Sequence, residues 1–68
     1  MRDINRLDNF YNELKEIHKK LPDWRFTQLT MNFMGWYYQK YNRDCFYVED
    51  NQVLKYFKEY INELIGGW

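Results

Sequence analysis

Apolar side chains recur at three- and four-residue steps through the first third of the chain, at Ile4, Leu7, Phe10, Tyr11, Leu14, Ile17 and Leu21. This spacing places them on one face of an α-helix. Asp3 suits the N-cap, because its carboxylate can accept a hydrogen bond from a free N–H of the first turn. Pro22 disfavours the α conformation at the residue before it. The pattern predicts a helix over about residues 4–21.

A second amphipathic stripe lies near the end of the chain and comprises Val53, Leu54, Phe57, Tyr60, Ile61, Leu64 and Ile65. Asp50 or Glu49 is the expected N-cap, and both carboxylates favour the positive end of the helix dipole. Gly66 and Gly67 suit the left-handed conformation that ends many helices. This stripe predicts a helix over about residues 51–65. Trp68 lies beyond it and either folds back or remains available for contact.

The segment between Trp24 and Tyr41 is apolar around most of a helical circumference, and Asp23 is its expected N-cap. Its predicted core positions are Phe26, Leu29, Phe33 and Tyr37. A narrow polar strip is formed by Arg25, Gln28, Asn32 and Gln39. A helix of this kind is either central in a core or shared between two partners. Gly35 in the middle of this helix has two possible explanations. Either another helix approaches its backbone closely, or the glycine leaves room for bulky neighbours.

The residues that connect this helix to the last one have good strand propensity. Asn42, Arg43 and Asp44 are typical of a turn, and residues 45–48 read Cys-Phe-Tyr-Val. A lone strand is not stable, so we expect an extended loop that tucks Phe46 and Val48 under the helices. The alternative is a strand that pairs with another chain. The predicted fold is all-α: a single helical domain over residues 1–68, built as a small three-helix bundle with an extended aromatic loop between the second and third helices.

Charge and residue content exclude several classes of function. Ten Lys and Arg balance ten Asp and Glu, which disfavours a nucleic-acid binder that relies on a phosphate-neutralising patch. No apolar run approaches the roughly 20 residues that span a bilayer, and the N-terminal residues lack an apolar signal-peptide region. A lone cysteine fits a reducing compartment. We therefore expect a soluble, cytoplasmic chain without a membrane partner.

The sequence offers little chemistry. It holds one histidine, His18, one cysteine, Cys45, and no serine. Zinc sites usually need about four ligands at regular spacing, and a general base needs an orienting carboxylate beside a substrate pocket. We expect His18 to be a half-covered boundary residue and Cys45 to be buried. No catalytic residue, cofactor, metal or small-molecule substrate is predicted, and the chain is expected not to be an enzyme.

Aromatic residues make up 22% of the chain, which exceeds what a small core can hold. Trp, Tyr, Met and Arg are enriched at the centres of protein interfaces, and Met adapts its shape readily. This surplus predicts a protein-interaction surface on the second face of the middle helix, covered by a homodimer partner or by a larger host protein. The predicted partner-binding residues are Trp24, Arg25, Gln28, Met31, Met34, Tyr38 and Trp68.

A DNA-binding regulator is the alternative function. The short turn at Leu21, Pro22 and Asp23 joins two predicted helices, as in helix–turn–helix domains. The recognition helix of such a domain presents a polar, basic face to the groove. The middle helix offers Arg25 on a narrow polar strip and is otherwise mostly aromatic, so its side chains disfavour this reading.

Twelve positions also form a pattern that resembles short uncharacterised proteins of phages and low-GC bacteria. The pattern is Pro-Asp-x-Arg-Phe-x-Gln-Leu, then Asn, then Asp-x-Phe-Tyr-x-Glu-Asp. Its positions here are Pro22, Asp23, Arg25, Phe26, Gln28, Leu29, Asn32, Asp44, Phe46, Tyr47, Glu49 and Asp50. The resemblance implies a phage or mobile-element origin. By analogy with small proteins from that setting, it implies an inhibitor of a host defence protein that acts by stoichiometric binding.

Overall fold

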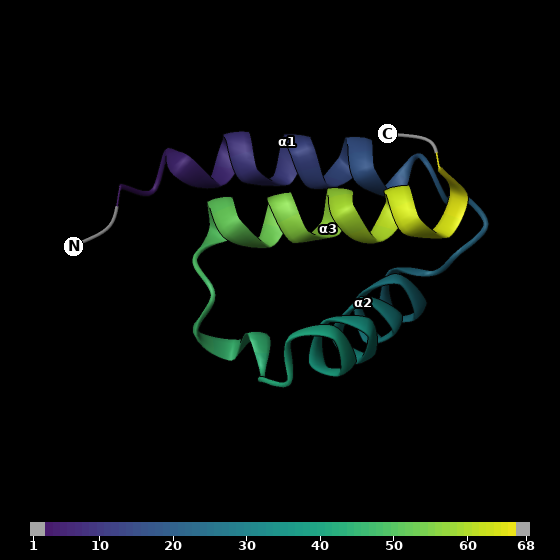
Figure 1. The fold of residues 1–68 in the computed structure, drawn as a ribbon. Coiled ribbons are helices and arrows are strands. Elements are labelled where there is room, and N and C mark those ends of the chain that lie inside the picture. Colours follow the sequence, from purple (N-terminus) through teal and green to yellow (C-terminus); the bar gives the residue numbers. More distant parts are fainter. Residues whose placement is uncertain (1–2, 67–68) are drawn as a thin grey trace.

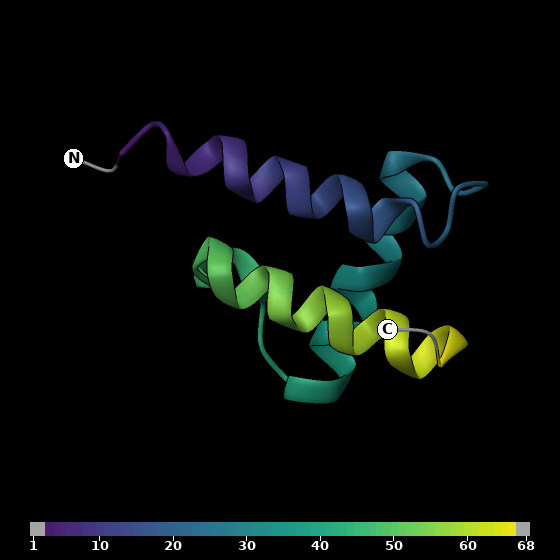
Figure 2. The same ribbon diagram turned by 90° about the horizontal axis from the view of Figure 1, so that it is seen from above.

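The computed structural model describes residues 3–66 and confirms the all-α prediction of a three-helix bundle. Its elements are α1 (Arg6–His18), α2 (Phe26–Tyr41), the one-turn 3₁₀ helix η1 (Cys45–Tyr47) and α3 (Asp50–Ile65). α1 and α3 lie side by side and run in the same direction (Figures 1 and 2). α2 crosses beneath them at a steep angle (Figures 1 and 2). α2 therefore meets the α1–α3 layer along one side only.

α1 is shorter at both ends than its apolar stripe predicts. It begins at Arg6 with Asn5 at the N-cap, and the Asp3 carboxylate instead accepts a hydrogen bond from the Asn5 N–H at 3.0 Å. Ile4 is exposed, since no other part of the bundle extends far enough to cover the start of the stripe. At the other end the helix stops at His18, and the Leu21 N–H donates to the His18 carbonyl in a closing turn before Pro22.

α2 begins two residues later than predicted, with Arg25 rather than Asp23 at the N-cap. The Gln28 side-chain oxygen accepts a hydrogen bond from the Arg25 N–H at 2.8 Å, which satisfies a donor that the first turn leaves open. The end at Tyr41 is as predicted. Asn42 closes the helix in the left-handed conformation, with φ 55° and its N–H 2.7 Å from the Tyr38 carbonyl.

The connection between α2 and α3 differs from the predicted extended loop. The Asp44 carboxylate accepts a hydrogen bond from the Phe46 N–H at 3.0 Å and thereby caps η1. This local cap offers the backbone an alternative to a sheet ladder at residues 45–48, and residues 3–66 contain no strand. Phe46 is exposed rather than tucked away, whereas Val48 is half-buried against the core as expected.

α3 begins one residue before the predicted start, with Glu49 at the N-cap, and ends as predicted at Gly66, whose φ is 65°. The last two apolar residues of its stripe, Leu64 and Ile65, stay largely exposed because they lie past the region where the helices pack. Trp68 lies outside the described residues.

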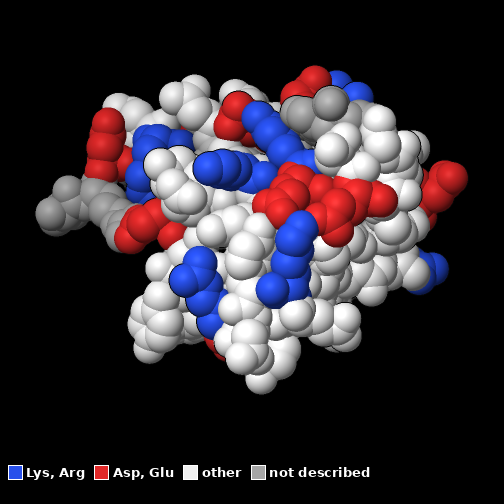
Figure 3. Space-filling view, in the orientation of Figure 1, with Lys and Arg blue, Asp and Glu red and all other residues white. Residues whose placement is uncertain are grey.

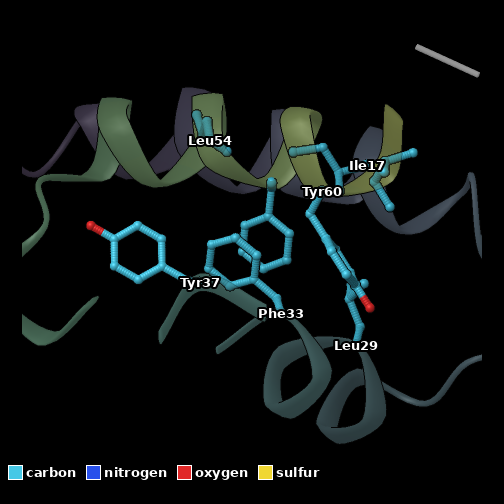
Figure 4. Packing of buried hydrophobic residues seen from close by; sticks show 8 residues of the cluster. Ile17, Leu29, Phe33, Tyr37, Leu54 and Tyr60 are labelled. Carbon is cyan, nitrogen blue, oxygen red and sulfur yellow. The ribbon is translucent and has the colours of Figure 1, made fainter. Parts of the chain in front are cut away.

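The core is centred on α3 and consists of Ile17, Leu29, Phe33, Tyr37, Leu54, Phe57, Tyr60 and Ile61. Phe33 of α2 stacks on Phe57 of α3 with ring centroids 3.8 Å apart. Figure 4 shows Phe33 and Tyr37 projecting from α2 toward α3. Leu29, Phe33 and Tyr37 form the inner face of α2. Phe26, also predicted for the core, is 57% exposed, because the first turn of the steeply inclined α2 lies beyond the other helices.

Candidate functional site

The side of α2 that faces away from the core is apolar and open to solvent. The solvent-exposed fractions of Met31, Met34 and Tyr38 lie between 52% and 70%. Thr27 and Gly35 are exposed as well, and at 100° per residue all five fall on one side of the helix. We call these five residues the outer face of α2. Three of the predicted partner-binding residues thus lie together on one surface.

The outer face carries no charge. Lys40 is the only charged residue between Phe26 and Tyr41, and its ammonium forms ion pairs with Glu59 and Glu63 on α3. It therefore points to the opposite side of the helix. In Figure 3, red and blue gather over α1 and α3, while the lower part of the view, where α2 and η1 lie, is mostly white. On the face that Figure 3 shows, charged side chains are sparser over α2 and η1 than over α1 and α3.

Gly35 lies at one edge of the outer face, beside the polar strip, and neither neighbour expected from the sequence is present within the described residues. A Cβ built on Gly35 would meet nothing within 4 Å, so among residues 3–66 no other helix approaches it closely and no bulky neighbour needs its space. A glycine inside a helix destabilises it by about 1 kcal/mol relative to alanine. Within the described residues, no contact offsets that loss.

Trp24 does not belong to the outer face, although it was predicted to lie on the same surface as Met31, Met34 and Tyr38. It precedes α2, is half-buried, and packs against the core. Its carbonyl oxygen lies 2.7 Å from Nε2 of His18, which donates a hydrogen bond to it. The turn after α1 folds Trp24 back onto the bundle. His18 is half-buried, as expected for a boundary residue.

Arg25 and Gln28 are exposed at the beginning of α2. The Gln28 side-chain oxygen is already engaged by the Arg25 N–H, so this residue has a structural role at the helix start. Both residues border the outer face without belonging to it. Trp68, the last predicted partner-binding residue, lies outside the described residues.

A polar network between α2 and α3 was not anticipated. Trp36 Nε1 donates to Glu63 at 3.0 Å, and Tyr41 OH donates to Glu59 at 2.8 Å. Lys40 lies between the two carboxylates and pairs with both. The hydrogen bonds from Lys40 lower the pKa of Glu59 and of Glu63, with further help from Tyr41 and Trp36 respectively. The register at which α2 crosses α3 creates this network, and periodicity along one helix does not encode that register.

A second cluster lies beside η1. Arg43 Nε donates to the Tyr37 hydroxyl at 2.9 Å, which satisfies the polar atom of a fully buried side chain. Tyr56 lies on the other side of the same guanidinium, with its hydroxyl 3.5 Å from Nη2. A groove of about 560 Å³ opens there, and its remaining lining residues are Asp44, Tyr47, Val48, Glu49 and Gln52. The rings of Phe46 and Tyr47, both exposed, meet edge to face at 4.8 Å next to it.

Cys45 is half-buried, and burial, followed by the nearby Asp44 carboxylate, raises the pKa of its thiol. A raised pKa leaves less of the reactive thiolate at neutral pH. Among residues 3–66, no three His, Cys, Asp or Glu side chains gather closely enough to hold a metal ion. No described helix has the length and apolar character needed to cross a membrane.

Comparison of the chain with protein-family models, with curated proteins and with solved structures found no match.

Proposed function

We propose that this chain is a non-enzymatic protein-binding module and that the outer face of α2 is its binding surface. The observation that carries the proposal is an uncharged, solvent-exposed apolar surface on the side of a helix opposite the core. The centres of protein interfaces are depleted of charged residues and enriched in Tyr and Met. Met31, Met34 and Tyr38 match this composition.

Binding of this kind acts by occupying a surface of the partner. Methionine side chains are flexible and polarisable, so Met31 and Met34 can fill an irregular apolar depression. Tyr38 adds a large, rigid contact area with a polar tip. The resemblance to short phage and low-GC bacterial proteins extends the proposal to an inhibitor of a host defence protein, which works in the bacterial cytoplasm by stoichiometric binding.

A DNA-binding regulator is less well supported. In a helix–turn–helix arrangement α2 would be the recognition helix, and its exposed side would face phosphates and base edges. That side has no charged residue, and Lys40 is held by two carboxylates on α3. The surface suits an apolar partner better than a polyanion.

Substitutions on two different surfaces of α2, the outer face and the polar strip, test the proposal. Immobilised wild-type chain and the variants Met31→Lys and Asn32→Lys would be exposed to bacterial lysate, with captured proteins quantified by mass spectrometry. Met31→Lys places a charge at the centre of an apolar interface, so we expect at least about a tenfold loss of the captured partner, or roughly 1.4 kcal/mol. Asn32 is exposed on the polar strip, and Asn32→Lys should retain it. Equal capture by both variants would contradict the proposal.

A further inference from the structure

The arrangement of large and small residues on the outer face of α2 indicates what can cover it. Residues four apart are neighbours on a helix surface, so Thr27, Met31 and Gly35 form one row, while Met34 and Tyr38 form the next. Gly35 leaves a notch in the first row, because nothing within 4 Å would meet even a Cβ there. Met34 stands next to that notch as a projecting side chain that is about half exposed.

The outer faces of two antiparallel α2 helices are complementary in shape. If two α2 helices cross antiparallel with a two-fold axis between Met34 and Gly35, Met34 of each copy faces the notch at the partner's Gly35. The same axis places Met31 opposite the partner's Tyr38. Sulfur–aromatic contacts of this kind are favourable. In addition, a glycine at the crossing point lets two backbones approach closely.

The electrostatics also permit two copies to meet here. A two-fold interface brings each charge on a surface close to its own copy, and charged surfaces therefore repel themselves. The outer face has no charged residue, since Lys40 is turned to α3. By contrast, α1 and α3 each carry five Asp, Glu, Lys or Arg residues, and charged side chains gather over these two helices in Figure 3. The outer face is the surface of α2 on which a second copy brings no like charges together.

We infer that a second copy of this chain is the partner of the outer face, bound as an antiparallel α2–α2 pair crossing at Gly35. This inference rests on the proposed function, because it names the occupant of the same binding surface. It also accounts for Gly35, whose unfavourable helix propensity has no compensating contact inside one copy. The core of one copy is small, and association is a common source of extra stability for domains of this size.

Sedimentation equilibrium over a range of concentrations tests the pairing. We expect the wild-type chain to approach twice its monomer mass at the highest concentration. Gly35→Leu fills the notch and should raise the dissociation constant at least about tenfold. The matched control is Asn32→Leu, which also introduces leucine and raises helix propensity, but on the polar strip. It should leave the dissociation constant unchanged.

Gly35→Leu should fold, because the space above Gly35 is empty in one copy, and its helical circular dichroism verifies this. Gly35→Ala is the second variant and should weaken the pair less than Gly35→Leu. A wild-type chain that stays monomeric at every concentration would overturn the inference. So would a dimer that Gly35→Leu leaves intact or that Asn32→Leu weakens equally.

The two proposals fail in different ways. Suppose that the wild-type chain is monomeric and captures another protein, and that Met31→Lys loses this capture. These results would contradict the α2–α2 pair and support the protein-binding function. Suppose instead that the wild-type chain is a dimer that Gly35→Leu dissociates, and that Met31→Lys and Asn32→Lys capture equal amounts of protein from lysate. These results would support the α2–α2 pair and contradict the broader protein-binding function.

Discussion

The inner and outer faces of α2 have similar apolar content and opposite surroundings. The inner-face residues are at most 3% exposed, while the three large residues of the outer face keep more than half of their surface in water. Both faces belong to one helix, so helix propensity does not distinguish them. The difference arises because α3 approaches α2 from one side only (Figure 1). Apolar content marks a surface that gains from burial, but the topology decides whether the chain itself can bury it.

The largest contrast between the faces should appear in the stability of one copy. Phe33→Ala removes a buried ring that stacks on Phe57, and such truncations destabilise a protein by about 3–5 kcal/mol. Met34→Ala changes the next residue, on the outer face, and should shift the free energy of unfolding by less than about 0.5 kcal/mol. Urea denaturation followed by circular dichroism, at concentrations low enough to keep single copies, measures both.

Because the total stability of a domain this small is a few kcal/mol, Phe33→Ala is expected to be largely unfolded without urea. A comparable loss in Met34→Ala would mean that the outer face is packed within one copy, and the contrast between the faces would then be wrong.

The polar side of α2 should show a smaller effect that depends on pH. Lys40 lowers the pKa of Glu59 and Glu63 below the ordinary 4.5. A carboxyl group with a lowered folded-state pKa stabilises the fold above its unfolded pKa, and this stabilisation is lost as the pH falls through the folded value. The melting temperature of the wild-type chain should therefore fall on acidification below about pH 4.5. Lys40→Met should flatten that fall.

The control for this experiment is Lys19→Met, which removes an exposed ion pair within α1, to Glu16 at 3.0 Å. Exposed pairs of this kind contribute little to stability, so its acid profile should follow the wild type. Added salt should weaken the effect of Lys40, because the groups are close to solvent. Superimposable acid profiles of the wild type and Lys40→Met would show that the network does not contribute to stability.

The helices and most of the inner face could be predicted from the sequence. Three-to-four-residue spacing located all three helices, and it identified Leu29, Phe33 and Tyr37 as core residues that the structure buries. Helix ends were less accurate, because capping depends on local hydrogen bonds such as that between Asp3 and Asn5. Phe26 was misplaced for a different reason: its helical angle matches the core, but its position along α2 lies past the crossing with α3.

The outer face was predicted only in part. The surplus of apolar residues on α2 correctly pointed to Met31, Met34 and Tyr38 as residues without a place in the core. Trp24 was assigned to the same surface because the helix was extended too far back, whereas the turn after Pro22 folds it onto the bundle. The network around Lys40 depends on which residues of α2 meet α3, and contacts between helices far apart in sequence follow from the tertiary fold.

The most direct measurement of the central claim is the solvent accessibility of the outer face in solution. Methionine methyl groups carrying ¹³C would be observed by NMR with a soluble paramagnetic agent, first in dilute chain and then at high concentration or with a captured partner. If the outer face is open in one copy and covered on binding, the Met31 and Met34 methyl signals should broaden strongly in the dilute sample and be protected in the bound one. Equal broadening of these signals in both samples would contradict the central claim.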